Sequence, residues 1–586
     1  MCGIAGYFGK KGQSPSEEIL DRLRDGLAHR GPDGDGRYVK GAVGLVQTRL
    51  AIIDLASGDQ PLFHENGSVL VANGEIYNYV ELRRDLGEAG FKTGSDSEIA
   101  LRLYARDGVA GFDLLRGMYA FAIHDPQDNS LILCRDPFGI KPLYYVETDA
   151  YFAFASEPHA LIVAGLAGAE VRAEARAEVL QLQFTTGGDT IFTGIERLLP
   201  GETLVLKNGR IVDRHRRLVL SDQGVNGISL EEALVDWDRV FEETVRLHQR
   251  SDVDYAMFLS GGVDSAALLA MMSRLNERPV WAYTAAFDSG SVYDEREQAH
   301  EVVKSCNARH VEVMFDECDF WSLLPAVAAA MDDPAADYAI LPTFKLAREV
   351  ARDFKVVLSG EGGDEMFAGY GRYRSVMRPF LLGGRGMRTR GTFDGLDVLR
   401  PEIIRGWRDG MVSAEIREKR GRRSRLAVAQ AVDCADWLPN DLLIKLDRCL
   451  MVHGLEGRTP FLDPEVAEFA YRLPDRLKIR GRTGKFMLRN WLDRCLPVAK
   501  PFTKKRGFTV PVGEWIGKEG KRLGPLVATQ PGIEEIARPG MVEKLFVTPG
   551  KKEGAAAWHL LFYALWHRSN VLGHAPAGNV FESLSR

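Results

Sequence analysis

The pattern of apolar and polar residues divides the chain into two regions of different periodicity. In the first region, residues 3–9 alternate as in a β-strand, and a helix-like stretch covers residues 15–28. Further strand-like runs lie at residues 119–124, 131–134, 143–146 and 151–155. Closely spaced strands with few helices between them predict antiparallel sheets stacked in layers.

From residue 230 onwards, short apolar runs alternate with segments of helical length. The apolar runs lie at residues 255–259, 280–287, 310–315 and 355–359. Strands that alternate with helices form parallel sheets, whose ligands bind at the carboxyl ends of the strands. We therefore expect binding residues directly after these runs. The polar stretch 220–227 is the predicted linker between the two regions.

The length of the chain supports this division. Its 586 residues exceed what one hydrophobic core usually supports, and we predict domains spanning residues 2–219 and 228–586. A hydrophobic content of 45% and a net charge of −6 are ordinary for a soluble enzyme, and this charge gives no general attraction to nucleic acid. The sequence predicts no membrane span and no secretory leader, so we expect a cytoplasmic protein. It leaves open whether the protein is a homodimer.

Seven cysteines, an odd number without a Cys-x-x-Cys pair, form neither a disulfide framework nor a zinc site. Six lie in ordinary strand or helix patterns and are expected to be structural: Cys134, Cys306, Cys318, Cys434, Cys449 and Cys495. Cys2 is different, because removal of Met1 would leave its thiol beside its own α-amino group. With pKa values of about 8.5 and about 7.7–8.0, these groups can act as nucleophile and base.

A second candidate site follows the apolar run 255–259. The sequence Ser260-Gly261-Gly262-Val263-Asp264-Ser265 precedes a stretch with helical spacing. Backbone N–H groups in such a glycine loop, together with the positive end of a helix, form an anion site. Asp264 would repel a phosphate unless a divalent cation lay between them, so Mg²⁺ is implied. The loop differs from the Gly-x-x-x-x-Gly-Lys-Ser/Thr phosphate loop.

A similar acidic, glycine-rich loop follows the run 355–359. It reads Ser359-Gly360-Glu361-Gly362-Gly363-Asp364-Glu365. Two such loops at neighbouring strand ends could hold Mg²⁺ and pyrophosphate between them.

The first region resembles the class II glutamine amidotransferase domain, an N-terminal-nucleophile fold built as a four-layer αββα sandwich. The likeness is carried by Cys2 together with residues 28–33, 47–54, 73–78 and 94–98. It implies that Cys2 attacks the glutamine amide and that the Asn73 side chain and the Gly74 N–H form the oxyanion hole. It also implies a set of glutamine-binding residues: Arg49 at the α-carboxylate, Glu75 and Asp96 near the α-ammonium, and Leu50, Ile53 and Asn73.

The resemblance implies lesser roles for two other segments of the first region. His29 and Arg30 are expected to serve a loop that orders over the bound amide. Residues 135–145 also fit the family and are interpreted as structural.

The second region resembles the ATP-pyrophosphatase domain of the asparagine synthetases and their β-lactam synthetase relatives, a parallel-sheet fold of the adenine nucleotide α-hydrolase type. Residues 441–448, 455–463 and 504–508 continue the likeness. It implies Asp264 and Asp364 as metal ligands, Glu361 at the acceptor and Lys485 facing the α-phosphate. The implied ATP-binding residues are Leu259, Ser260, Gly261, Gly262, Asp264, Ser265, Phe287, Ser359 and Gly360.

Together the two resemblances imply one reaction. Glutamine is hydrolysed at Cys2, and ammonia passes through an apolar internal channel to β-aspartyl-AMP, giving asparagine, glutamate, AMP and pyrophosphate. One departure concerns the acceptor: Tyr338 stands where the family's Thr-Thr-x-Arg element has arginine. An alternative is therefore the same mechanism on another carboxylate, such as a sugar acid of a surface polysaccharide.

Two other functions remain open. The arginine-rich segment 385–425 predicts either a solvated, mobile insertion or a contact with an acidic or lipid-linked acceptor or with RNA. A tRNA-modifying ATP pyrophosphatase would use such a segment, although the glutaminase region opposes it. A non-catalytic glutamine or nucleotide sensor is the third possibility, and the retained Cys2, Asn73 and Lys485 oppose it.

Overall fold

The computed structural model describes residues 2–220, 227–287, 296–378, 381, 383–419, 421–503 and 510–586. Most of the predicted linker at 220–227 and the family-like run 504–508 lie outside these residues. None of the helices in these ranges combines the length and the apolar character needed to cross a bilayer.

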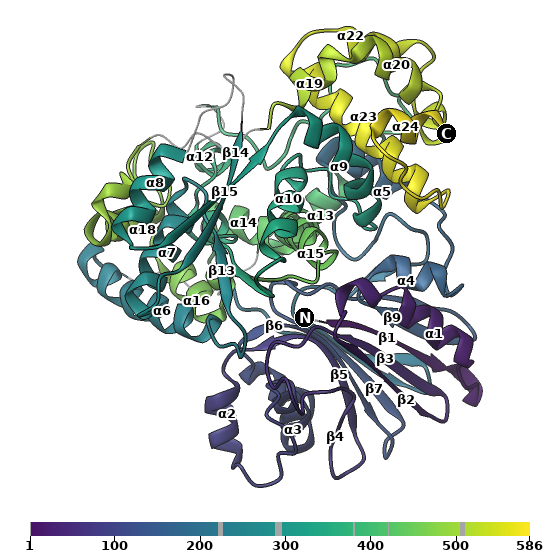
Figure 1. Cartoon of the computed structure of the whole chain (residues 1–586), viewed down its shortest axis with the longest axis vertical. Helices are drawn as coiled ribbons and strands as arrows, with labels where there is room; N and C mark the ends of the chain where they lie inside the picture. Colours follow the sequence, from purple (N-terminus) through teal and green to yellow (C-terminus); the bar gives the residue numbers. More distant parts are fainter. Residues whose placement is uncertain are drawn as a thin grey trace.

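The first part of the chain forms two six-stranded antiparallel sheets (Figure 1). One sheet has the order β10-β8-β9-β1-β3-β2, with bounds Glu196–Arg197, Tyr144–Glu147, Tyr151–Ala155, Cys2–Gly9, Val43–Arg49 and Gly34–Lys40. The other has the order β12-β11-β7-β6-β5-β4, with bounds Arg210–Arg216, Glu202–Lys207, Ser130–Arg135, Gly117–Asp125, Val69–Ile76 and Leu62–Phe63.

Strand β1 shows how the two sheets are covered. All eight of its residues are buried, because both of its faces are packed. Ile4 and Phe8 lie in the core between the sheets, whereas Ala5 and Tyr7 pack against helices α1 (Glu17–Asp25) and α4 (Pro158–Val163). The outer face of the second sheet packs against α2 (Tyr79–Leu86) and α3 (Glu98–Asp107). The predicted four-layer αββα sandwich is confirmed.

The second part of the chain contains a five-stranded parallel sheet. Its order is β15-β14-β13-β16-β17, with bounds Arg309–Phe315, Trp281–Phe287, Tyr255–Phe258, Val356–Leu358 and Glu456–Arg458. Helices cover both faces (Figure 1). One face packs against α6 (Leu230–His248), α7 (Val263–Leu275) and α8 (Arg296–Ser305), and the other against α9 (Glu317–Ala330), α10 (Ile340–Val350) and α15 (Ile444–Met451). The predicted parallel sheet is confirmed.

The remaining helices surround this core. They are α5 (Ala173–Leu182), α11 (Gly363–Phe367), α12 (Gly371–Met377), α13 (Asp409–Glu418), α14 (Arg425–Val432), α16 (Pro464–Arg472), α17 (Asp475–Lys478), α18 (Phe486–Cys495), α19 (Val512–Lys518), α20 (Gly520–Ala528), α21 (Pro531–Ile536), α22 (Met541–Val547), α23 (Lys551–Asn570) and α24 (Val580–Ser585). A π-helix, Asp433–Leu443, joins α14 to α15.

Two sequence-based expectations need correction. The arginine-rich segment 385–425 is not simply a solvated insertion, because Phe393, Leu399 and Met411 within it are buried in the apolar cores. Of the cysteines expected to be structural, Cys318 and Cys495 are exposed.

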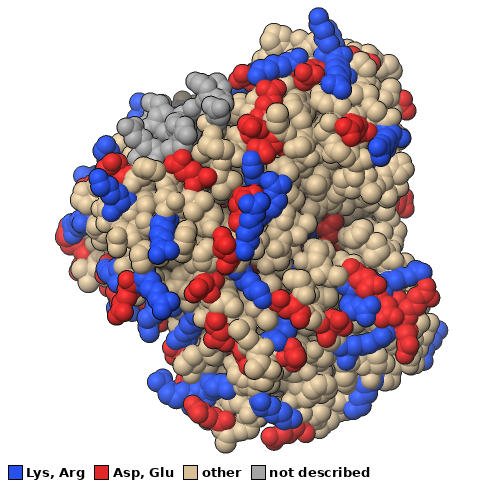
Figure 2. All heavy atoms as spheres, viewed as in Figure 1, with Lys and Arg blue, Asp and Glu red and all other residues tan. Residues whose placement is uncertain are grey.

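Figure 2 shows basic and acidic side chains interspersed over the face in view, without a large area of one sign.

Candidate active sites

Cys2 opens strand β1 and is 7% exposed. Its backbone nitrogen donates a hydrogen bond to Asn73 Oδ1 at 3.1 Å, and Asn73 comes from β5 in the facing sheet. The side-chain nitrogen of Asn73 is buried and has no hydrogen-bond partner among the described residues. The Asn73 amide is therefore held by its oxygen, and its N–H groups remain for another acceptor. Burial raises the pKa of the Cys2 thiol, so forming the thiolate requires a nearby base.

Gly74 follows Asn73 in a conformation that favours glycine. Its φ is 146°, and a Cβ at this position would lie 2.0 Å from the carbonyl oxygen of Met118 on β6. Any larger residue would force β5 and β6 apart. The close pairing of these strands therefore fixes the backbone next to Asn73.

Arg49 ends strand β3 and pairs with Cys2 across the sheet. Its Nη1 lies 2.6 Å from the carboxylate of Asp59, and its Nη2 donates to the carbonyl oxygen of Asp54 at 2.6 Å. The Asp59 side chain is 81% exposed, so a ligand carboxylate can replace it at little cost in burial. The predicted contacts Leu50 and Ile53 are both buried.

Two buried carboxylates, Glu75 and Asp96, complete this first site, each 4% exposed. Asp96 Oδ2 accepts the Ile76 N–H at 2.6 Å, whereas Glu75 Oε2 is buried without a hydrogen bond among the described residues. Burial, the largest cause, raises the pKa of Asp96 to about 6 and that of Glu75 well above its usual value. Two buried acids, one with an unsatisfied oxygen, form a suitable site for an ammonium group.

Arg30 links the first site to the second part of the chain. This position differs from the expectation that Arg30 serves a loop that orders over the bound glutamine amide. Arg30 is fully buried, and its Nε donates to the carbonyl oxygen of Cys2 at 3.3 Å. Its Nη atoms bind Asp447 on α15 at 2.7 and 3.0 Å, and Nη1 also binds Glu157 at 2.6 Å. His29, 37% exposed, pairs with the same Glu157 at 3.1 Å.

Arg458 forms a second link that the sequence reasoning missed. Its carbonyl oxygen accepts the N–H of Ser359 at 2.8 Å, so its backbone holds the start of the second glycine loop. Its Nε binds Glu456 at 2.6 Å, and its Nη2 lies 3.8 Å from Glu75 Oε2. The only sequence signal was its place inside the family-like run 455–463, and the structure shows it fully buried.

The first glycine loop lies between β13 and α7 and is closed by its two serines. Ser265 Oγ donates to the carbonyl oxygen of Ser260 at 2.7 Å and lies 3.0 Å from Ser260 Oγ. Neither Gly261 nor Gly262 has a positive φ, so the backbone conformation of this loop does not by itself require glycine. Ser260 is exposed and the glycines are half-buried, which leaves the loop open on one side.

The second glycine loop packs directly against the first. A Cβ on Gly360 would lie 2.9 Å from the backbone nitrogen of Ser265, and one on Gly363 would lie 2.4 Å from Asp264 Oδ1. Because no side chain fits between them, these glycines allow the two loops to touch. The loops follow β13 and β16, which are parallel neighbours, so the predicted meeting of the two loops is confirmed.

Lys485 lies between the two aspartates predicted to bind a metal. Its Nζ binds Asp264 Oδ2 and lies 2.6 Å from Asp364 Oδ1, and the residue is 2% exposed. Lys485 directly precedes α18 with a φ of 55°, a left-handed conformation that is uncommon for residues other than glycine. Two carboxylates therefore converge on one cation at the meeting point of the loops.

Near Glu361, which is predicted to lie at the acceptor, the structure places a cation that the sequence did not reveal. Lys445 Nζ on α15 lies 3.1 Å from Asp337 and 3.8 Å from Glu361. Lys445 is 5% exposed, and the half-buried Tyr338 follows Asp337. Phe287, one of the predicted ATP-binding residues, ends β14 with its ring centroid 6.0 Å from that of Phe315.

These two sites, an amino-terminal cysteine site and a paired glycine-loop site, define an ATP-dependent glutamine amidotransferase. A family model described as glutamine amidotransferase domain matches residues 1–216, and one described as asparagine synthase matches residues 236–568. The chain belongs to the asparagine synthase family.

Curated relatives match over nearly the whole chain. Asparagine synthetase [glutamine-hydrolyzing] 1 of Bacillus subtilis is 28% identical over 99% of this chain and 100% of its own length. A putative asparagine synthetase of Mycobacterium tuberculosis is 32% identical over 97% of each chain, and Amidase chry2 of Gibberella zeae is 27% identical over 93% of each. Among solved structures, the allosteric regulatory enzyme of purine biosynthesis covers 54% of this chain with 18% identity and a TM-score of 0.30, too low a likeness to add to the fold described above.

Proposed function

We propose that this protein is a glutamine-hydrolysing asparagine synthetase, which uses ATP and the amide nitrogen of glutamine to convert aspartate to asparagine. One observation carries the proposal: a buried Cys2 bound to Asn73 and a lysine bridging Asp264 and Asp364 occur in one chain. The curated relatives with this name, matching over nearly the full length, support it.

In the first half-reaction, the Cys2 sulfur attacks the side-chain carbonyl carbon of glutamine. Once Met1 is removed, the α-amino group of Cys2 accepts the thiol proton. The free N–H groups of Asn73 and the Gly74 N–H donate to the oxyanion that forms. Ammonia leaves with a proton returned by the same amine, and water then releases glutamate from the thioester.

The ends of glutamine are held by groups at the margin of this site. Arg49 binds the α-carboxylate in place of the exposed Asp59. Glu75 and Asp96 receive the α-ammonium, which satisfies the buried Glu75 Oε2 and offsets the cost of ionising both acids. The buried Leu50 and Ile53 would supply apolar contacts to the glutamine side chain.

In the second half-reaction, the acceptor carboxylate attacks the α-phosphate of ATP and pyrophosphate leaves. The loops supply backbone N–H groups and hydroxyls for the phosphates, and Phe287 packs against the base. The proposed ATP-binding set is Leu259, Ser260, Gly261, Gly262, Asp264, Ser265, Phe287, Ser359 and Gly360. Glu361, 28% exposed at the rim of the second loop, faces the acceptor.

Asp264 and Asp364 fit a divalent cation, because both already direct oxygens at one cation, Lys485 Nζ. Bound Mg²⁺ would neutralise charge on the pyrophosphate leaving group. Lys485, once released from the two aspartates, places its ammonium where charge develops on the α-phosphate.

Ammonia must travel between the two sites without being protonated. Leu50 beside Arg49 and Leu259 before Ser260 belong to one cluster of buried apolar residues, and the predicted route would pass along this apolar core. The Arg30–Asp447 contact binds the two parts together next to Cys2. Asp447 and Lys445 lie two residues apart on α15, so one helix contacts both sites.

Lys445 is the candidate replacement for the arginine that Tyr338 displaces. Its ammonium is held by Asp337 and lies 3.8 Å from Glu361. A point charge binds a carboxylate without the forked geometry of arginine, so it selects less strictly for one acceptor. This difference, with the relative named amidase, favours a second candidate: the same reaction on another carboxylate, such as a sugar acid.

The test is to supply glutamine, ATP and Mg²⁺ and to measure AMP and pyrophosphate with and without aspartate. The proposal predicts aspartate-dependent AMP and stoichiometric asparagine. AMP formation that requires a different carboxylate would replace aspartate with that acceptor, and stimulation by tRNA would favour the tRNA-modifying alternative. If no carboxylate gives AMP, the alternative of a non-catalytic glutamine or nucleotide sensor would be favoured.

A matched variant separates the two sites. Cys2→Ala should abolish the use of glutamine and retain synthesis from added ammonia, because Cys2 has no role in adenylation. Loss of both activities in a folded Cys2→Ala protein would contradict separable sites.

A further inference from the structure

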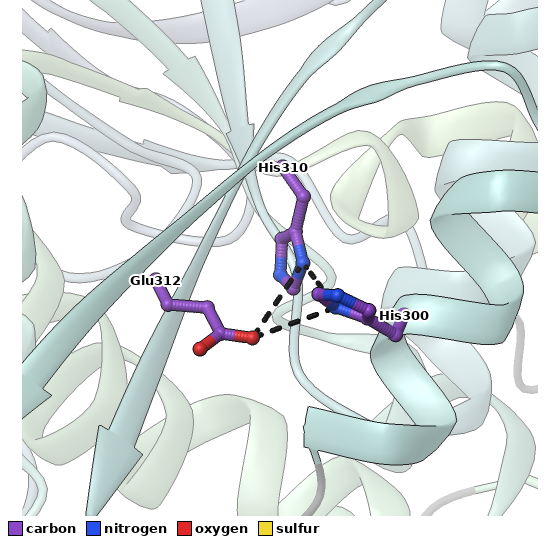
Figure 3. A group of neighbouring side chains, drawn as sticks. All are labelled: His300, His310 and Glu312. Carbon is purple, nitrogen blue, oxygen red and sulfur yellow. Dashed lines mark hydrogen bonds and ion pairs between the residues drawn. The ribbon is translucent and has the colours of Figure 1, made fainter.

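Three potential metal ligands converge at a place that the amidotransferase reaction does not use. His300 on α8 and His310 and Glu312 on β15 direct their side chains toward one another (Figure 3). The two Nδ1 atoms are 3.1 Å apart, and Glu312 Oε1 lies 3.5 Å from His300 Nδ1 and 3.9 Å from His310 Nδ1. One ligand atom from each residue therefore lies at the corner of a small triangle.

The size of this triangle matches a zinc site. Ligands at about 2.0–2.2 Å from zinc in a tetrahedron are separated by about 3.3–3.5 Å. The three observed separations of 3.1, 3.5 and 3.9 Å bracket that value, so the side chains need to move by only a few tenths of an ångström. Three protein ligands leave a fourth position for water.

The His310 ring is held by a hydrogen bond of the kind that orients metal-binding histidines. Its Nε2 lies 2.9 Å from Thr284 Oγ1 on β14, and its side chain is only 8% exposed. If Nε2–H donates to this hydroxyl, the lone pair of Nδ1 points toward His300. Outer hydrogen bonds of this kind fix the tautomer of metal-bound histidines.

The position of the cluster separates it from the metal implied for the ATP reaction. His310 is the second residue of β15, whereas Asp264 and Asp364 follow the carboxyl ends of neighbouring strands. Phe315 lies five positions beyond His310 on the strand, or roughly 16 Å at about 3.3 Å per residue. The cluster therefore lies toward the opposite end of the sheet.

We propose that His300, His310 and Glu312 form a binding site for a divalent transition metal of the zinc class. The metal joins α8 to the edge strand β15, so it stabilises the edge of the nucleotide-binding sheet. Two neutral imidazoles and one carboxylate suit Zn²⁺ or Co²⁺ better than Mg²⁺, which prefers oxygen ligands.

The test measures metal bound to the full-length protein in a Cys2→Ala background, which removes a competing thiol. The protein is stripped with a chelator, exposed to Zn²⁺, separated from free metal and analysed for zinc per chain. We expect one equivalent, and Co²⁺ should give the visible absorption bands of tetrahedral coordination. His310→Ala and Glu312→Gln should each lose this equivalent.

Two further variants sharpen the result. His215→Ala is the matched control, because His215 is an exposed histidine paired with a carboxylate, Asp213, at 2.9 Å. It should keep the zinc. Thr284→Val should keep the ligands but weaken zinc affinity by about 10–100-fold.

Thermal unfolding supplies the folding control. Zinc should raise the melting temperature of the Cys2→Ala parent and of the His215→Ala control but not that of Glu312→Gln. The proposal is overturned if the parent takes up no zinc, or if folded His310→Ala and Glu312→Gln bind as much zinc as the control. In that case the cluster is a hydrogen-bonded histidine pair.

Discussion

Glutamine binding should depend on pH through the buried acid Asp96. Burial raises the pKa of Asp96 to about 6, and the α-ammonium of glutamine is proposed to bind only its ionised form. The fraction ionised is about one half at pH 6 and about one tenth at pH 5. The dissociation constant of glutamine should therefore rise about tenfold as the pH falls from 7.5 to 5.

The raised pKa of Asp96 determines whether glutamine binding strengthens or weakens with pH. An acid with a raised pKa is protonated over a wider range at low pH, so binding strengthens as the pH rises through 6. Glu75 faces the same site with a pKa that burial also raises, and it adds to proton release in the same direction. Binding near pH 6 should therefore release protons to the buffer.

The assay is titration calorimetry of glutamine into the Cys2→Ala protein, which binds without turnover, between pH 5 and pH 8. Asp96→Asn in that background should remove the component of the pH dependence centred near pH 6. It should also weaken binding at pH 8 by about 2–5 kcal/mol, or at least thirtyfold, because a buried charge pair loses one partner.

Asp128→Asn is the control, since Asp128 is exposed and pairs with Lys207 at 2.8 Å in the same domain. It should leave both the affinity and its pH dependence unchanged. An affinity of the Cys2→Ala protein that stays constant from pH 5 to pH 8 would refute the reasoning. So would unchanged glutamine binding by a folded Asp96→Asn protein.

Three other changes have expected outcomes. Arg30→Met removes one of the two buried arginines shared by Glu157 and Asp447 and leaves them Arg448, so it should lower the free energy of unfolding by up to about 3–5 kcal/mol in urea denaturation; an unchanged midpoint would contradict this. Lys485→Met should reduce pyrophosphate release at least about a hundredfold while glutaminase activity persists, and equal loss of both would argue against its placement. Gly74→Ala should reduce glutamine hydrolysis by about a hundredfold or more, because its Cβ would lie 2.0 Å from a carbonyl oxygen, and ammonia-dependent synthesis reports whether the fold survives.

Local patterns in the sequence were sufficient for most of the architecture. The two-residue alternation of residues 3–9 became β1, and the apolar runs 255–259 and 355–359 became the adjacent parallel strands β13 and β16. Short-range signals determine strands and glycine loops, because their geometry depends on residues close together in the chain. For this reason the meeting of the loops at Ser260 and Ser359 could be predicted.

Contacts between distant parts of the sequence could not be predicted. Arg30 and Asp447 are separated by 417 positions, and nothing local to either indicates the other. Lys445 likewise lies near Tyr338 only because the fold packs α15 beside Asp337, and nothing local to either segment indicates this.

Helix α15 has a practical consequence for engineering. Its Asp447 binds Arg30 of the amidotransferase part, and its Lys445, two positions earlier, lies 3.8 Å from Glu361. A chimera that imports a foreign glutaminase without an arginine at position 30 would lose the ion pair across the junction and leave Asp447 with Arg448, at 2.8 Å, as its cationic partner among the described residues. An exchange of either half should therefore redesign the eight residues of α15, Ile444–Met451, together with the imported part.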